Sequence, residues 1–162
     1  MAVTDEMVCF SLYSAARATT QAYRALLAPW GLTYPQYLVL AILWMEGEQT
    51  IGSLGDAMQL DSGTLSPLVR RLEQAGYVTR ARSSADERVV TVGLTEAGTA
   101  LRTEVASVHT TIAALAGMQD DDQRHRLIAE LQELTERLQK TGATPHPLSL
   151  IHISEPTRLR RI

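Results

Sequence analysis

The chain has 162 residues, a formal net charge of −3, 45% hydrophobic residues and 20% charged residues. These values predict one folded domain with a buried core, and they exclude a chain that is disordered as a whole or a polybasic protein that coats nucleic acid indiscriminately. The one cysteine, Cys9, excludes an intrachain disulfide and a cysteine-rich zinc site. No apolar run reaches the roughly 18 residues of a membrane span, and no signal-peptide pattern begins the chain, so we expect a cytoplasmic protein without membrane contact.

The beginning of the chain predicts two helices, because its apolar residues recur at helical spacing. The first covers residues 5–28, with Thr4 expected as its N-cap and a Pro-Gly break at residues 29–31. Thr33 begins the second helix, which runs to Glu46. We expect three apolar side chains of this second helix to face the core: Leu38, Ile42 and Met45.

Residues 50–76 predict a helix-turn-helix motif. A short third helix is followed by a fourth, which Asp61 caps and which ends before Gly76, a residue suited to the left-handed position after a helix. Pro67 falls inside the fourth helix and removes one hydrogen bond there. Periodicity therefore leaves open whether the regular helix begins at Ser62 or at Pro67.

The pattern then changes from helical to alternating, which predicts a β-hairpin. Its strands cover residues 77–82 and 88–94, and the polar stretch between them is expected to form the turn. Two short helices followed by a charged hairpin match a winged helix-turn-helix, with the wing at residues 77–94. We therefore expect a mainly α fold with a small β-hairpin wing.

The remaining residues predict two more helices and a tail. Thr95 is expected to cap a long helix to about Ala116, and residues 120–122 open a last helix with coiled-coil spacing. Residues 143–162 contain three prolines, follow no periodicity and resemble translated vector read-through. We expect them to form a disordered or artefactual tail outside a single domain of residues 1–142. The apolar stripe of the last helix comprises Leu127, Ile128, Leu131, Leu134 and Leu138.

Positive charge is concentrated in the predicted motif. Residues 62–92 hold five arginines and three acidic residues, whereas residues 1–142 carry a net charge of −5. A locally basic face on an acidic protein suits DNA binding, although charge alone favours the alternative, an ordinary solvated face. The order of helix, turn, helix and hairpin shifts the prediction to double-stranded DNA as the partner. The start of the fourth helix would enter the major groove. The candidate DNA contacts are Ser62, Gly63, Thr64, Ser66, Arg70, Arg71, Arg80 and Arg82.

Residues 60–78, together with Asp86, Glu87 and Arg88 and with residues 94–98, resemble the MarR family. Residues 9–15 and 32–37 are similar to its organic hydroperoxide resistance regulators, of the type with a single cysteine. The resemblance covers roughly residues 5–140. It implies a homodimeric repressor with N- and C-terminal dimerisation helices, bound to an inverted-repeat operator. It also implies that Arg88 reaches the minor groove and that Asp86 braces it.

Cys9 and two tyrosines are the candidate sensing residues. A thiolate attacks peroxides to give sulfenic acid, whereas a buried cysteine is more often a small hydrophobe. Tyr23 lies fourteen residues after Cys9 on nearly the same helix face, which is about 21 Å along the axis. It would therefore reach a cysteine only in a second, antiparallel subunit. The resemblance implies that Tyr23 and Tyr34 contact the reactive cysteine of the partner, where phenol donors stabilise a thiolate.

The leading hypothesis is a repressor without enzymatic activity, metal or cofactor, released from DNA when organic hydroperoxides oxidise Cys9. Because the chain has no second cysteine, a low-molecular-weight thiol or a backbone amide must trap the sulfenic acid. The first alternative is a MarR-type repressor that responds to a small aromatic ligand. The second is a thiol peroxidase, although enzymes resembling peroxiredoxins place Thr three residues before the nucleophile, where this chain has Glu6.

Overall fold

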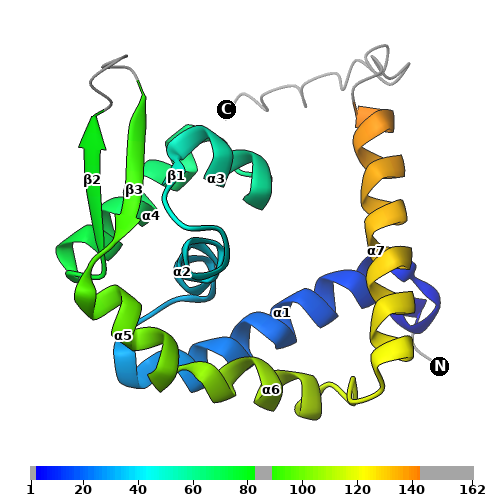
Figure 1. The fold of residues 1–162 in the computed structure, drawn as a ribbon. Coiled ribbons are helices and arrows are strands. Elements are labelled where there is room, and N and C mark those ends of the chain that lie inside the picture. The colour runs from blue at the N-terminus through cyan, green and yellow to red at the C-terminus, as the bar shows by residue number, and fades with distance from the viewer. Residues whose placement is uncertain (1–2, 83–88, 143–162) are drawn as a thin grey trace, which may run out of the picture. The chain divides into compact units, whose positions relative to one another are not determined.

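The computed structural model describes residues 3–82 and 89–142 and divides into two compact units, Met1–Ala116 and Gly117–Ile162. The described part of the first unit contains helices and a small antiparallel sheet, which confirms the predicted mainly α fold with a hairpin wing (Figure 1). Its helices are α1 (Val8–Leu27), α2 (Tyr34–Glu46), α3 (Ile51–Met58), α4 (Ser62–Gln74), α5 (Glu96–Glu104) and α6 (Ala106–Leu115). Its strands are β1 (Gln49–Thr50), β2 (Val78–Arg82) and β3 (Val90–Leu94).

Helix α1 begins at Val8, three residues later than its spacing predicts, and Thr4 does not cap it. The preceding residues Val3–Glu6 form a 3-10 turn instead, in which the carbonyl oxygen of Thr4 accepts a hydrogen bond from the Met7 amide at 3.2 Å. The predicted cap is wrong because this tighter turn takes its place.

Helix α2 begins with a capping box, since the Gln36 side chain accepts a hydrogen bond from the Thr33 amide at 2.9 Å. Its predicted inward face is wrong, because Met45 is 82% exposed and Leu38 and Ile42 are only half-buried. Elements α1, α3, α4, α5 and β3 all pack against α2. A helix that is apolar on most sides carries little information about which face is inner. Its buried residues are Gln36, Tyr37, Val39, Leu40 and Leu43.

Helix α4 begins at Ser62 and keeps Pro67 inside it, which settles the choice that periodicity left open. Asp61 is its N-cap, as predicted, and accepts a hydrogen bond from the Thr64 amide at 2.9 Å. The helix presents its buried residues at helical spacing toward the core: Leu65, Val69 and Leu72.

Helix α4 ends in a Schellman turn. The Tyr77 amide donates to the Leu72 carbonyl at 3.0 Å, and the Gly76 amide donates to the Glu73 carbonyl at 2.9 Å. Gly76 has a φ of 79°, the left-handed conformation that the sequence predicts for it. The chain therefore leaves α4 in a defined direction and enters β2 one residue after Tyr77.

The sheet has the strand order β1-β3-β2, and both pairs are antiparallel. The hairpin strands β2 and β3 are confirmed, with Arg80 opposite Val92. Strand β1 has only two residues, too few for an alternating pattern to reveal it. The predicted turn, with Asp86 and Arg88, lies outside the described residues.

The predicted long helix after Thr95 is two helices, because α5 ends at Glu104 and α6 begins at Ala106. Neither glycine nor proline marks this break in the sequence, and Val105 at the break is 1% exposed. Thr95 caps α5 as predicted, since its hydroxyl oxygen accepts from the Gly98 amide at 2.9 Å.

The described part of the second unit is helix α7 (Asp121–Gly142), which begins where the acidic run predicts a helix start. Several of its predicted stripe residues are exposed: Ile128 at 43%, Leu131 at 41% and Leu138 at 60%.

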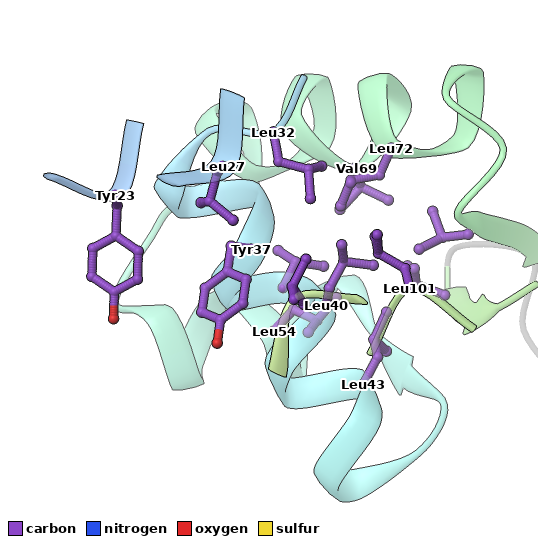
Figure 2. Packing of buried hydrophobic residues seen from close by; sticks show 14 of the residues in the cluster. Tyr23, Leu27, Leu32, Tyr37, Leu40, Leu43, Leu54, Val69, Leu72 and Leu101 are labelled. Carbon is purple, nitrogen blue, oxygen red and sulfur yellow. The ribbon is translucent and has the colours of Figure 1, made fainter. Parts of the chain in front are cut away.

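The core of the first unit joins α1, α2, α3, α4 and α5 (Figure 2). Fully buried leucines such as Leu40 and Leu54 contribute about 1.5–3 kcal/mol each on removal from water. Figure 2 shows Tyr23 and Tyr37 at one end of this cluster, with their hydroxyl groups pointing the same way.

In the described part of the chain, no single helix has the length and apolarity of a membrane span; only the bent pair of α1 with its 3-10 extension and α2 meets those criteria jointly.

Candidate DNA-binding surface and thiol site

The first turn of α4 forms an exposed polar surface that contains Ser62, Gly63 and Thr64. The Thr64 hydroxyl donates to Asp61 Oδ2 at 2.8 Å, and this hydrogen bond and that of the Thr64 amide hold the pKa of the Asp61 carboxyl below its usual range. A Cβ on Gly63 would lie 2.9 Å from Asp61 Oδ1, so glycine at this position avoids a steric clash with the capping carboxylate. Ser66, one residue into the second turn, is half-buried.

The arginines of the predicted basic face differ in their surroundings. Arg70 and Arg71 on α4 and Arg82 on β2 are exposed. Arg80 instead forms an ion pair with Glu73, with 2.7 Å between Nη2 and Oε2. The structure thus places the described basic residues of the motif on two neighbouring elements, α4 and β2, while Arg88 and Asp86 lie outside the described residues.

Cys9 is the second residue of α1 and is exposed, so it is not the buried small hydrophobe of the alternative interpretation. Large apolar side chains around it are exposed too: Met7 (49%), Val8 (66%), Phe10 (43%) and Tyr13 (58%). An exposed apolar stretch of this kind is typical of a surface at which another protein binds.

Tyr23 and Tyr34 come together at the other end of α1, with their rings stacked at a centroid distance of 4.1 Å. Tyr37 joins them, 5.7 Å from Tyr23. We call these three residues the tyrosine cluster. Burial, with a smaller effect of the neighbouring phenols, raises the pKa of Tyr23 to about 12, and burial raises the pKa of Tyr34 and Tyr37 as well. All three remain protonated hydrogen-bond donors at neutral pH.

The sequence did not identify Tyr37 as a member of the candidate sensing site, although its spacing from Tyr34 indicates that the two are neighbours. Tyr37 follows Tyr34 by three residues on the same helix, and residues at that spacing are neighbours on a helix surface. Cys9, in contrast, is fourteen residues from Tyr23 in one continuous helix, which is about 21 Å along the axis. Within one chain the structure therefore groups the tyrosines but leaves the thiol apart from them.

A chain of contacts connects the tyrosine cluster to the start of the wing. The Tyr37 ring packs edge-on against Trp44 at 6.1 Å, and Trp44 Nε1 donates to the Gly98 carbonyl at 2.8 Å. Gly98 in α5 lies so close to Tyr77 that an added Cβ would be 2.0 Å from the Tyr77 carbonyl oxygen. Tyr77 in turn precedes β2 directly.

A pocket of about 670 Å³ lies beside these contacts. The three phenols of the tyrosine cluster line one part of it, and residues of α2, α5 and α6 line the rest, including Trp44, Arg102 and His109.

Comparisons with known proteins agree on one family. Residues 21–105 match a family described as "Transcriptional regulator SarA/Rot". The regulator TtmR of Methylorubrum extorquens is 42% identical over 144 residues, which are 88% of this chain and 73% of the relative. The organic hydroperoxide resistance transcriptional regulator of Bacillus subtilis is 40% identical over 134 residues, 83% of this chain and 90% of the relative. The chain belongs to the MarR family.

A solved structure of a DNA-bound protein supports the same assignment. The structure of reduced AbfR bound to DNA is 35% identical, covers 81% of this chain and 91% of AbfR, and superposes with a TM-score of 0.70. The protein is thus a DNA-binding transcriptional regulator of the MarR family, related to the organic hydroperoxide regulators. TtmR and the Bacillus subtilis relative are both named as transcriptional regulators.

Proposed function

We propose that the protein is a homodimeric repressor that leaves an inverted-repeat operator when an organic hydroperoxide oxidises Cys9. The observation that carries the proposal is the placement of an exposed thiol and a buried cluster of phenol donors at opposite ends of α1. Two copies with antiparallel α1 helices would bring the thiol of one to the phenols of the other. The name of the Bacillus subtilis relative supports an organic hydroperoxide as the trigger.

The chemistry requires one thiol per subunit. The Cys9 thiolate attacks one peroxide oxygen, so that an S–O bond forms, the O–O bond breaks, and the alkoxide leaves as an alcohol after taking up a proton. The resulting sulfenic acid condenses with a low-molecular-weight thiol to give a mixed disulfide and water. Tyr23 and Tyr34 donate hydrogen bonds to the thiolate, and the added oxygen or thiol group displaces these donors.

On the DNA side, α4 enters the major groove and the wing lies beside it. A shift at the dimer interface changes the spacing between the two α4 helices, and one half-site is then lost. The proposed contacts are Ser62, Gly63, Thr64 and Ser66 at the start of α4, Arg70 and Arg71 on α4, Arg82 on β2, and Asp86 and Arg88 in the part of the wing outside the described residues. Arg80, which the sequence predicts as a contact, is not among them, because its charge is paired with Glu73.

The test uses a fluorescein-labelled duplex that the reduced wild-type protein selects from a random-sequence pool. We expect cumene hydroperoxide to lower the fluorescence anisotropy of the wild-type complex and to leave the Cys9→Ser complex bound. Mass spectrometry with a small thiol present should find a mixed disulfide on Cys9. Release of the duplex from the Cys9→Ser protein by the peroxide would refute thiol sensing.

The tyrosine cluster has a matched control in Tyr13, which lies on the same helix but is 58% exposed. Tyr23→Phe with Tyr34→Phe should slow the oxidation of Cys9, because the thiolate loses its donors, whereas Tyr13→Phe should not. A mixed dimer of a Cys9→Ser chain and a Tyr23→Phe/Tyr34→Phe chain tests the arrangement between subunits. Its single Cys9 meets intact phenols only if the thiol and the phenols come from different chains, so this Cys9 should be oxidised at the wild-type rate. Oxidation as slow as in the Tyr23→Phe/Tyr34→Phe protein would mean that the thiol and the phenols belong to one chain.

The pocket beside Trp44 favours a second candidate trigger, a small aromatic anion. Its phenols, Arg102 and His109 offer aromatic faces, hydrogen-bond donors and a positive charge. Titration of the Cys9→Ser protein with benzoate, followed by calorimetry and by duplex binding, separates the two triggers. Release of the duplex by benzoate alone would favour the aromatic ligand as the trigger. In a separate assay, steady consumption of many equivalents of peroxide by the wild-type protein would indicate a peroxidase.

A further inference from the structure

Arg80 differs from the other arginines of the DNA-binding motif because its charge is already paired. Both its Nε and its Nη2 lie within hydrogen-bond distance of Oε2 of Glu73, at 2.8 and 2.7 Å. The side chains are 30% and 34% exposed, respectively, so water screens this pair less than the exposed pair of Arg137 and Glu133. Arg82, two residues further along the same strand, is exposed and forms no ion pair with a described residue.

The pair joins the two elements that a winged helix presents to DNA. Glu73 lies in the last turn of α4, and Arg80 lies in the middle of β2, opposite Val92 of β3. Between them the Schellman turn at Gly76 directs the chain from helix to strand, and the Thr95 amide holds the Tyr77 carbonyl at 3.0 Å. The turn restrains the beginning of β2, and the ion pair adds a restraint three residues further along the strand.

The charges of the pair argue against a direct phosphate contact. A neutralised arginine releases few DNA counterions, and the Glu73 carboxylate beside it repels phosphate. We infer that Arg80 is a positioning residue, which holds the wing at a fixed angle to α4 through Glu73 and supports DNA binding without contacting DNA. This inference rests on DNA binding alone and not on the redox trigger, so it stands or falls independently of Cys9.

The test is the salt dependence of binding to the selected duplex, measured for reduced protein by fluorescence anisotropy. The informative variant is Glu73→Gln, because it removes a negative charge. A phosphate contact by Arg80 predicts that this change leaves binding equal or tightens it. A positioning role predicts that Glu73→Gln weakens binding, by about fivefold, as much as Arg80→Gln does. The double variant should then bind no more weakly than Arg80→Gln alone, because both changes remove the same restraint.

Two further variants test the positioning role of Arg80 even if a single substitution disturbs folding. The exchanged pair Glu73→Arg/Arg80→Glu should recover most of the lost affinity, because it restores the link between α4 and β2. Arg82→Gln makes the same charge change on the same strand, and it should lower the slope of log affinity against log salt by about 1. The inference is overturned if Glu73→Gln binds as tightly as wild type, or if Arg80→Gln lowers the salt slope as Arg82→Gln does.

Discussion

Gly98 is the position at which a single methyl group should damage the fold most clearly. An added Cβ would lie 2.0 Å from the Tyr77 carbonyl oxygen and 3.2 Å from Leu94 Cδ2. Carbon and oxygen atoms come no closer than about 3.3 Å in ordinary contacts, so α5 and the start of β2 must separate by more than 1 Å. Overpacking costs about 1–3 kcal/mol, and loss of the Thr95–Tyr77 hydrogen bond costs about 1 kcal/mol more. The higher helix propensity of alanine offsets somewhat less than 1 kcal/mol of this destabilisation.

We therefore expect Gly98→Ala to lower the free energy of unfolding by about 2–3 kcal/mol, measured by urea denaturation with circular dichroism. Gly52→Ala is the matched control, because the nearest atom to its Cβ is Thr50 Oγ1 at an ordinary 3.6 Å. That variant should be as stable as wild type or slightly more stable. If the free energy of unfolding of the Gly98→Ala protein lies within about 0.5 kcal/mol of the wild-type value, the close approach of Gly98 to Tyr77 does not limit the size of this residue.

Three further outcomes follow from burial and titration. Leu40→Ala should cost about 2–5 kcal/mol of unfolding free energy, whereas Met45→Ala on the same helix should change it by less than about 0.5 kcal/mol; equal effects in urea denaturation would contradict the observed inner face of α2. Burial raises the pKa of Tyr23 from 10.0 to about 12, so the unfolded chain loses this proton first as pH rises. Stability should fall by up to about 2 kcal/mol between pH 10 and 12, and Tyr23→Phe should remove part of that fall in denaturation curves recorded across the window. Asp61→Ala should lower the urea midpoint at neutral pH, and the difference should fade in acid below pH 3.8, where the carboxyl of the native cap becomes protonated; a constant difference would argue against capping by the charged form.

Local features of the sequence predicted most of the fold. The side chains of Asp61 and Thr95 bond the amide three residues on, and Gly76 takes the left-handed position, so each helix boundary they mark depends on its own neighbours. Strand β1 could not be predicted, because it depends on pairing with β3, which is distant in the sequence. The break at Val105 could not be predicted because no glycine or proline marks it.

The candidate site divides in the same way. Helix geometry showed that Cys9 and Tyr23 cannot meet within one chain, and the resemblance paired Tyr23 with Tyr34, which the structure places in contact. The pairing of Arg80 with Glu73 was not predicted, because it depends on the turn that folds β2 back along α4. The basic residues of a sequence therefore mark a DNA-binding face, but only packing separates a residue placed to touch phosphate from one that positions the wing.

The exposed apolar residues at the start of α1 have a consequence for every stability measurement described above. Met7, Val8 and Phe10 leave a folded single chain with apolar surface in contact with water. Two native copies can associate through this surface, whereas two unfolded chains cannot. By mass action, association therefore stabilises the native state more as the protein concentration rises. The melting temperature should rise as the protein is concentrated, and variants are comparable only at one concentration.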